Sequence, residues 1–313
     1  MTLRFTLRQL EYFVAVGEEG SIAKASDKVN VSSPSISSAI SQLENEFGIL
    51  LFVRKHAHGL MLTQAGRQFM IQSHSVLHEA NAMNKLATTL SGNVQGPLNI
   101  GCLLTFAQML VPGLRRVFEE RFPLVQVSQF ELDQMAIFDQ LRHARLDLAL
   151  TYDLDIPQDI AFSPLIELPP YAMMPKDHPL AHLPTVSVDE LKEHPMVMLN
   201  LPHSTDYFRS LFSALGVEPK IVERTRDMAV LRSLVANGYG YSLANLLPLN
   251  HQSPDGRPLK FIPISGPVRK LQLGIVMIEG ADRVLTVSTF VKHCRDYIVN
   301  GNLGRNTNNE GHE

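Results

Sequence analysis

The sequence predicts an N-terminal all-α winged helix-turn-helix with a long linker helix, followed by an α/β domain of two Rossmann-like halves. Three observations lead to this fold class. Residues 21–44 contain two short helical patterns with a break of about three residues between them. Residues 63–90 form one uninterrupted helical pattern. From residue 98 onward, strand patterns alternate with helix patterns, which is typical of parallel sheets covered by helices on both faces.

Composition sets the broad class of the protein. The chain has 313 residues, 45% hydrophobic and 19% charged, which is the balance of a globular protein with room for two domains. No run of residues approaches the roughly 18 apolar positions of a membrane span, and nothing resembles a signal peptide. We therefore expect a cytoplasmic protein without membrane contacts. Because the net charge is −3, nucleic-acid binding has to be argued from pattern rather than from bulk charge.

The three N-terminal helix patterns each begin at a hydroxyl residue. Thr6 and Ser21 are suited to cap the first two helices. Ser32 stands as a natural N-cap for the third, with Pro34 in the first turn, where a missing N–H costs nothing.

The third helix pattern separates an apolar face from a face of short polar side chains. The expected buried residues are Ile36, Ile40, Leu43 and Phe47. The opposite face carries hydroxyl and amide groups where a solvated helix usually carries Lys and Glu, so we predict a recognition helix in the major groove of double-stranded DNA. The predicted contact residues are Ser32, Ser33, Pro34, Ser35, Ser37, Ser38 and Gln42. The alternative is the serine-rich surface of an ordinary helix pair.

Residues 50–62 are predicted to form a two-stranded wing. Its turn carries Arg54 and Lys55, whose positive charges suit DNA phosphates or the minor groove. His56 and His58 in the same turn raise the alternative of a metal site. A third ligand is missing, so we predict neither a metal nor a cofactor.

A long helix is expected after Thr63, which is suited to cap it. Its apolar residues recur every seven positions, which is typical of a coiled-coil seam. The seam residues are Phe69, Val76, Met83 and Leu90. We therefore expect a homodimer formed through this helix.

The sequence around residues 91–97 has the Gly, Ser, Asn and Pro content of a hinge. Beyond it, the expected strands cover 98–103, 125–130, 146–150, 171–174, 196–199, 220–223, 240–244 and 271–277. One expected helix follows the first of these strands and ends near residue 122. The others cover 137–144, 205–215, 227–237 and 285–299. The predicted domains are a DNA-binding domain (1–63), a linker helix (64–92), an α/β domain (93–300) and a disordered tail (301–313). Within the α/β domain, half I covers about 95–162 plus 267–300, and half II about 163–266.

The order of these motifs resembles the LysR-type transcriptional regulators. The N-terminal likeness is specific and rests on Leu7–Ser26, Val31–Glu44, Leu51–Arg54 and Leu62–Gly66. Individually weaker motifs follow in the family's order at Leu98–Gly101, Phe122–Val125, Leu146–Leu150, Pro175–Ala181 and Val235–Leu243. The resemblance covers roughly residues 5 to 299, which is nearly the whole chain.

This resemblance implies a fold and a way of working. The α/β domain would be like a periplasmic binding protein of type 2, with a small-molecule effector between its halves, and the protein would form homotetramers on bipartite promoter sites. Family members commonly have Gln where this chain has Ser33 and Arg where it has Ser38. Ser cannot make the bidentate base contacts of Gln and Arg. We therefore expect this protein to recognise its DNA site more through phosphate contacts, wing contacts and DNA shape.

The effector is expected where strands of the α/β domain run into helix N-termini. Helix N-termini favour anions, so we predict a small organic acid. The predicted contact residues are Thr105, Phe106, Asp133, Gln134, Leu201, Pro202, His203, Asp227, Met228 and Tyr241. The resemblance supports Thr105, where the family often has a hydroxyl, but the family more often has Ser or Thr in place of Asp133. The alternative is that Thr105 merely caps its helix.

Three other functions are alternatives to an effector-controlled regulator. An enzyme is not expected, because no nucleophile, phosphate-binding or dinucleotide motif stands in its required context. A redox-sensing regulator acting through Cys102 and Cys294 would need their Cα atoms within about 7 Å. A free-standing solute-binding protein would leave the N-terminal helix-turn-helix unexplained.

Overall fold

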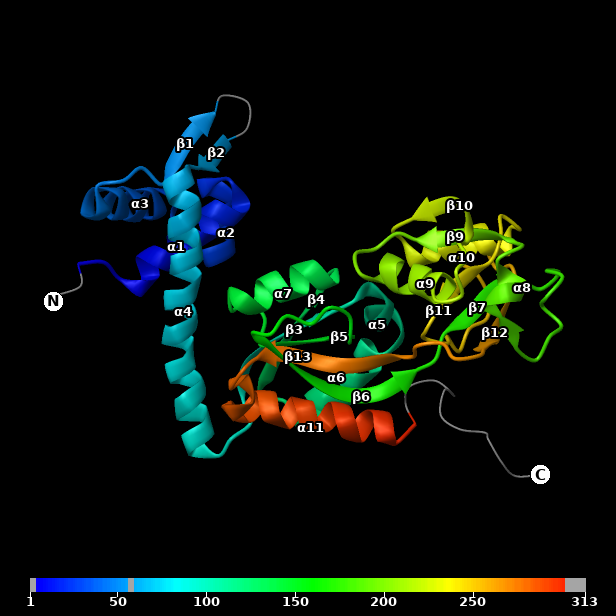
Figure 1. Cartoon of the computed structure of the whole chain (residues 1–313). Coiled ribbons are helices and arrows are strands. Elements are labelled where there is room, and N and C mark those ends of the chain that lie inside the picture. Colours follow the sequence, from blue (N-terminus) through cyan, green and yellow to red (C-terminus); the bar gives the residue numbers. More distant parts are fainter. Residues whose placement is uncertain (1–3, 56–58, 302–313) are drawn as a thin grey trace. The chain divides into compact units, whose positions relative to one another are not determined.

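The computed structural model describes residues 4–55 and 59–301 of the chain (Figure 1). These residues form two compact units, one comprising the chain up to Asn93 with Arg142–Arg145, the other comprising the remainder. Among the described residues, no helix combines the length and the hydrophobicity that a membrane crossing requires.

The N-terminal unit is a helix-turn-helix with a two-stranded wing and a long final helix (Figure 1). Its elements are α1 (Leu7–Glu19), α2 (Ile22–Val29), α3 (Ser33–Phe47), β1 (Phe52–Lys55), β2 (Gly59–Leu62) and α4 (Gln64–Ser91). β1 and β2 pair antiparallel, as expected for the wing. Asn30 ends α2 in the left-handed conformation with φ 53°, so the chain turns sharply before α3 begins.

Three of the four predicted helix caps are confirmed. The hydroxyls of Thr6, Ser21 and Thr63 each accept a hydrogen bond from the backbone N–H three residues further on. Ser32 does occupy the N-cap position of α3, but its side chain makes no capping bond. Its hydroxyl instead lies 2.8 Å from the hydroxyl of Ser35. The cap geometry predicted for Ser32 is therefore wrong.

Aromatic rings hold the N-terminal unit together. The ring centroid of Phe13 lies 5.4 Å from that of Phe52 and 5.3 Å from that of Phe69. Phe69 in turn lies 4.9 Å from Phe47. Phe47 was predicted to be buried but keeps 41% of its surface exposed, because it is the last residue of α3.

The predicted coiled-coil seam is only partly available to a partner. Phe69 and Val76 pack against the core of their own N-terminal unit. Met83 is 74% exposed, whereas the side chain of Leu90 lies outside the described part of the chain. Heptad spacing could not separate packing within the chain from packing between chains, because both need an apolar stripe on α4.

The α/β unit is built on a five-stranded sheet with the strand order β4-β3-β5-β13-β6. The strands are β3 (Gly96–Cys102), β4 (Val125–Glu131), β5 (Leu148–Tyr152), β6 (Ile160–Leu168) and β13 (Leu271–Ile278). The expected parallel pairing holds for β4, β3 and β5. β13 runs antiparallel to β5 and to β6, so the sheet is mixed. It returns from half II without a crossover helix, which makes the antiparallel direction possible.

Helices cover both faces of this sheet (Figure 1). α7 (Gln134–Arg142) packs on one face; α6 (Val111–Arg121) and α11 (Leu285–Val299) pack on the other. The helix expected to reach residue 122 without a break is divided at Leu110 into α5 (Leu104–Met109) and α6. Pro112 in the first turn of α6 has no N–H and cannot continue the hydrogen bonding of α5.

Half II contains two smaller sheets. One has the order β11-β7-β12-β8, formed by β7 (Tyr171–Pro175), β8 (Val186–Ser187), β11 (Ser242–Ala244) and β12 (Leu259–Ser265). The other pairs β9 (Pro195–Leu199) with β10 (Lys220–Thr225) in parallel. The remaining helices are α8 (Val188–Leu191), α9 (Ser204–Ser213) and α10 (Met228–Ala236). Strands β6, β8 and β12 were not predicted from the sequence.

Candidate functional site

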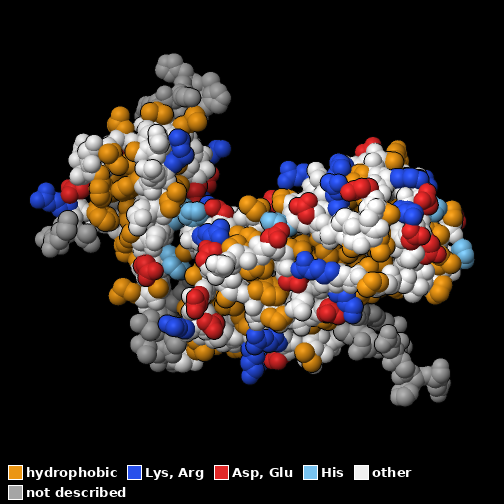
Figure 2. All heavy atoms as spheres, in the orientation of Figure 1, with side chains coloured by type: hydrophobic (Ala, Val, Ile, Leu, Met, Phe, Trp, Pro, Cys, Tyr) orange, Lys and Arg blue, Asp and Glu red, His pale blue; other side chains and the backbone are white. Residues whose placement is uncertain are grey.

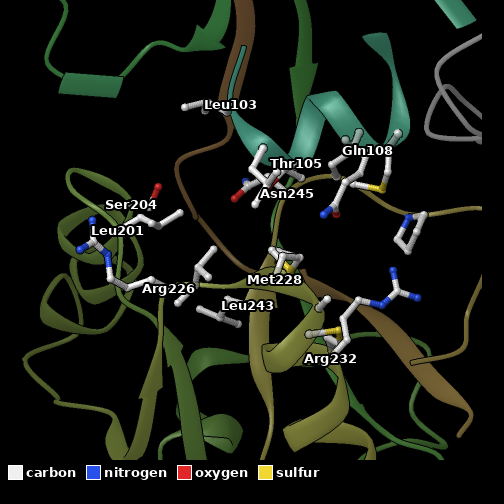
Figure 3. A pocket seen from close by; sticks show the side chains of 18 of the residues that line it. Leu103, Thr105, Gln108, Leu201, Ser204, Arg226, Met228, Arg232, Leu243 and Asn245 are labelled. Atoms are coloured by element: carbon white, nitrogen blue, oxygen red, sulfur yellow. The ribbon is translucent and has the colours of Figure 1, made fainter. Parts of the chain in front are cut away.

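A cavity of about 910 Å³ lies between the two halves of the α/β unit (Figure 3). Half I contributes the start of α5 and the chain between β4 and α7. Half II contributes the segments before α9 and α10, the inner face of α10 and the loop that follows β11. A volume of this size is ample for a small organic ligand.

The cavity brings together six of the ten residues predicted to contact an effector. These are Thr105, Asp133, Gln134, Leu201, Pro202 and Met228. They come from both halves and from four separate loop-to-helix junctions. Their convergence follows from the rule that loops after strands meet at one edge of a sheet. The other four predicted residues, Phe106, His203, Asp227 and Tyr241, do not line the cavity.

Phe106 and Tyr241 are core residues. Both are fully buried, and the ring of Phe106 lies 4.9 Å from that of Tyr152 in an edge-on contact. Tyr241 forms an isolated parallel bridge with Met196 just before β11. The sequence placed them near the right junctions, but the side-chain direction within each turn was decided by packing.

Thr105 does not cap its helix. Leu103 occupies the N-cap position of α5, so Thr105 is the second residue of the helix and its side chain is free of the capping role. Figure 3 shows Thr105 beside Asn245 at the cavity, which leaves the binding interpretation of Thr105 standing and removes the capping alternative.

Two helix N-termini that were expected to attract an anion are already occupied by carboxylates of the chain. Asp227 is the N-cap of α10 and accepts hydrogen bonds from the N–H groups of Ala229 and Val230, at 2.7 and 3.0 Å. Asp133 accepts a bond of 2.9 Å from the N–H of Ala136 in α7. Both carboxylates add negative charge where a bound acid was predicted. These two helix N-termini therefore give no support to an acidic effector.

His203 contacts half I instead of the cavity. Its Nδ1 lies 2.6 Å from Oδ2 of Asp155, and its Nε2 lies 3.2 Å from the sulfur of Met135. His203 has φ 62° and ψ −40°, and the N–H of Ser204 donates to the carbonyl of Pro202 at 2.7 Å, which makes a γ-turn with positive φ. This turn aims the imidazole across the interface between the two halves.

Gln134 has a structural task in addition to lining the cavity. It is buried, and its Nε2 donates to the backbone carbonyls of Tyr152 and Leu154. These bonds fix the segment after β5 to the start of α7. Asp155 follows directly, so Gln134 also positions the carboxylate that meets His203.

The charged residues of the cavity are two acids and two arginines. The acids, Glu131 and Asp133, both belong to half I, and the arginines, Arg226 and Arg232, both belong to half II. Arg226 is 71% exposed and lies 4.0 Å from a carboxylate oxygen of Asp133. Arg232 has no acidic partner among the described residues, and burial lowers the pKa of its guanidinium.

Several residues that line the cavity were not predicted from the sequence. Gln108 follows Thr105 by three positions and Arg232 follows Met228 by four, so helical periodicity from the predicted contacts would have found both. Asn245 follows directly after β11 and fits the same junction rule. No sequence signal pointed to the loop of residues 246–256, which forms one wall of the cavity.

The predicted DNA-contact residues lie on the outer side of α3. Pro34, Ser37 and Ser38 are exposed, and Ser33 is half-buried. The side chains of Ser32, Ser35 and Gln42 are also exposed. Gln42 is engaged within the chain, because its Oε1 accepts a 2.7 Å bond from the Nε2 of Gln9 on α1.

The side chains of Arg54 and Lys55 lie outside the described part, and so do His56, His58 and most of the predicted tail, residues 302–313. Among the described residues, no cluster of three His, Cys, Asp or Glu side chains is arranged to hold a metal.

Both cysteines are buried in the core of the α/β unit, Cys102 at the end of β3 and Cys294 in α11. Burial raises the pKa of the Cys102 thiol to about 12 and also raises that of Cys294. The thiolate is the reactive form, so neither site favours attack on an oxidant at neutral pH.

Two family models match the chain. Residues 7–67 match the bacterial regulatory helix-turn-helix protein of the lysR family, and residues 91–298 match the LysR substrate binding domain. The chain is 27% identical over 277 residues to a hydrogen peroxide-inducible genes activator of Pectobacterium carotovorum subsp. carotovorum, covering 88% of this chain and 91% of the relative.

Solved structures agree with this result. The crystal structure of HinK, a LysR family transcriptional regulator from Pseudomonas aeruginosa, is 32% identical with a TM-score of 0.63, covering 93% of this chain and 98% of the other. Full-length CbnR complexed with its target DNA, at 22% identity, has a TM-score of 0.68 over 93% of this chain and 99% of that one. This second likeness concerns the fold.

Proposed function

Since this chain belongs to the LysR family of DNA-binding transcriptional regulators, we propose that a small organic acid binds between the two halves of its α/β unit and controls transcription. The observation that carries the proposal is the cavity of about 910 Å³, to which both halves contribute side chains. A ligand touching both halves stabilises one arrangement of the halves over others by its differential affinity. The chain would act as a regulator and not as an enzyme.

Thr105 provides the first test of this cavity. Thr105→Val removes a hydroxyl from the cavity wall and keeps the shape of the side chain. Since Thr105 is not a cap, we expect the stability of α5 to change little while the transcriptional response to the inducer falls. A promoter-reporter assay with the natural inducer measures the response, and a gel-shift assay checks that DNA binding is kept. A normal response in the variant would remove Thr105 from the site.

The recognition helix α3 is proposed to enter the major groove through its serine-rich side. Ser35→Asp would place a negative charge among DNA phosphates and should weaken binding by at least about tenfold. An acid near a helix N-terminus favours folding, so this loss would not come from instability. The exposed Asn45, near the other end of α3, gives the matched control Asn45→Asp. Equal affinities of both variants for the footprinted fragment would contradict the proposed orientation.

The wing is proposed to contact phosphates or the minor groove through Arg54 and Lys55. Arg54→Ala should weaken binding to all sequences and lower the slope of log affinity against log salt by about one unit. Titrations at several salt concentrations measure this slope. An unchanged slope and affinity would place Arg54 outside the interface.

The chain is further proposed to form dimers through α4 and tetramers through pairs of dimers. The support within the structure is Met83 on α4, an apolar side chain that the described residues leave 74% exposed. Met83→Glu should dissociate the dimer, because burying two carboxylates together is strongly unfavourable. Sedimentation that shows the parental mass for this variant would place the interface elsewhere.

A second candidate function is peroxide sensing, which is favoured by the name of the Pectobacterium relative. In this chain it would have to use Cys102 or Cys294. Their burial and raised pKa values oppose this role. A variant with both cysteines changed to Ala separates the two functions, because a peroxide sensor would lose its response and an organic-acid sensor would keep it.

A further inference from the structure

Arg232 is a half-buried cation on the wall of the cavity. It lies one helical turn after Met228 on α10, and Figure 3 shows both side chains at the cavity, with Gln108 across from Arg232. Among the described residues it has no carboxylate partner, whereas the other lining arginine, Arg226, lies 4.0 Å from Asp133. A cation removed from water without a counter-ion is costly and is normally paired.

The bonds that Arg232 does make leave one end of its guanidinium available. Its Nη2 donates to the backbone carbonyls of Asn250, at 2.6 Å, and Gln252. The guanidinium lies 6.0 Å from the ring centroid of Phe261. Nη1 makes no hydrogen bond within the described residues, and Nε is buried without a partner. Carbonyl oxygens orient the group but do not neutralise its charge.

Apolar side chains line the cavity beside Arg232, neutral polar side chains lie opposite them, and two acids line the half I side. Met228 and Leu243 lie between Arg232 and Arg226 in Figure 3. Glu131 and Asp133 line the half I side, and a carboxylate oxygen of Asp133 lies 4.0 Å from the guanidinium of Arg226. A second anionic group on a ligand would therefore meet two carboxylates of the protein.

We propose that the effector is an amphipathic monocarboxylate whose acid group pairs with Arg232 and whose apolar body covers Met228 and Leu243. This inference rests on the proposed function of the cavity and names the class of ligand that it takes. Arg232 becomes a specificity-determining residue, because it is the cavity cation that has no charge partner within the described part of the chain. The same geometry selects against dicarboxylates of equal length.

The test uses thermal stabilisation of the full-length protein by matched probes: octanoate, octanedioate, octanamide, benzoate, terephthalate and benzamide. The monocarboxylates should stabilise the protein more than the diacids and the neutral amides. Arg232→Gln should weaken monocarboxylate binding by at least about thirtyfold, whereas Arg226→Gln should change it little. Met228→Trp, which fills the cavity, should remove binding of all probes and so exclude binding to other apolar surfaces.

Arg232 also anchors the loop of residues 246–256, so Arg232→Gln could lose the loop together with the charge. Arg232→Lys keeps the charge and loses the fork of bonds to the carbonyls, and it should retain the preference for monocarboxylates over amides. Loss of that preference in Arg232→Lys would overturn the inference.

The outcomes separate this inference from the proposed function. Amides or diacids that bind as well as monocarboxylates would overturn the assignment to Arg232 and leave the cavity as an effector site. The assignment to Arg232 would also be overturned if Arg226→Gln abolished binding and Arg232→Gln did not. If no probe stabilises the protein, the inference is overturned. If none of a broader set of organic acids stabilises it either, the proposed cavity function is overturned as well.

Discussion

The contact between His203 and Asp155 predicts a measurable coupling between the two halves of the α/β unit. The two side chains belong to different halves and meet at 2.6 Å. His203 is 19% exposed and Asp155 73% exposed, so solvent screens the pair strongly. We therefore expect a coupling of about 0.2–1 kcal/mol, the range of exposed pairs, rather than the larger value of a buried one.

A double-mutant cycle isolates this coupling from the other effects of each substitution. It compares the parent with His203→Ala, Asp155→Ala and the double variant by calorimetry of the α/β transition in the full chain. For a unit of this size, each kcal/mol shifts the transition by about 2–4 °C. The double variant should be less destabilised than the sum of the single ones. Strictly additive effects would show that the two halves are not coupled through this pair.

The γ-turn at His203 adds a second, independent expectation. A non-glycine residue at φ 62° and ψ −40° carries backbone strain of about 1–3 kcal/mol. His203→Gly loses the same side-chain contacts as His203→Ala but relieves this strain, so it should be more stable than His203→Ala by about 1 kcal/mol. If His203→Ala and His203→Gly are equally stable, the backbone at residue 203 carries no strain.

Three further predictions concern other parts of the chain. Gly66→Ala should unfold the N-terminal unit and abolish DNA binding, because an added Cβ would lie 2.1 Å from the carbonyl oxygen of Leu51. Circular dichroism measures the folding and gel shifts measure the DNA binding, and a folded variant would contradict the prediction. Asp227→Ala should lower the stability of the α/β unit by about 1 kcal/mol in calorimetry through the lost cap of α10, and Asp227→Asn should restore most of it. The Cys102 thiol should resist iodoacetamide at pH 8 in the native protein and react in urea, as followed by mass spectrometry. Its native pKa of about 12 lies above the unfolded value of 9.0, so its contribution to stability is full below pH 9 and is lost between pH 9 and 12; fast native alkylation would reverse this reasoning.

The cavity suggests how ligand and fold cooperate. Half I supplies acids and half II supplies arginines, so the ion pair between Asp133 and Arg226 and the contact between Asp155 and His203 both join the halves. An effector placed between them adds contacts to an interface that is already held by weak, solvent-screened pairs. Weak pairs of this kind allow a ligand to shift the population of closed and open arrangements with modest binding energy.

Local sequence determined the elements that depend on neighbouring residues. Thr6, Ser21 and Thr63 begin their helices as predicted, because a capping hydroxyl needs only the backbone three residues away. The polar face of α3 and the junctions that hold Thr105 and Met228 were also readable, since helical periodicity and the strand-to-helix rule act over short distances.

Tertiary structure decided everything that depends on partners distant in the sequence. Phe69 and Val76 pack on their own unit, Phe106 faces the core instead of the cavity, and Asp227 keeps for α10 the cap that a ligand was expected to use. None of these outcomes follows from local pattern, because an apolar stripe or a carboxylate has the same sequence signature whichever neighbour it meets. Arg232 shows the same limit. Its charge is evident from the sequence, but only the fold places it beside two carbonyls and without an ion pair to any acid of the described residues.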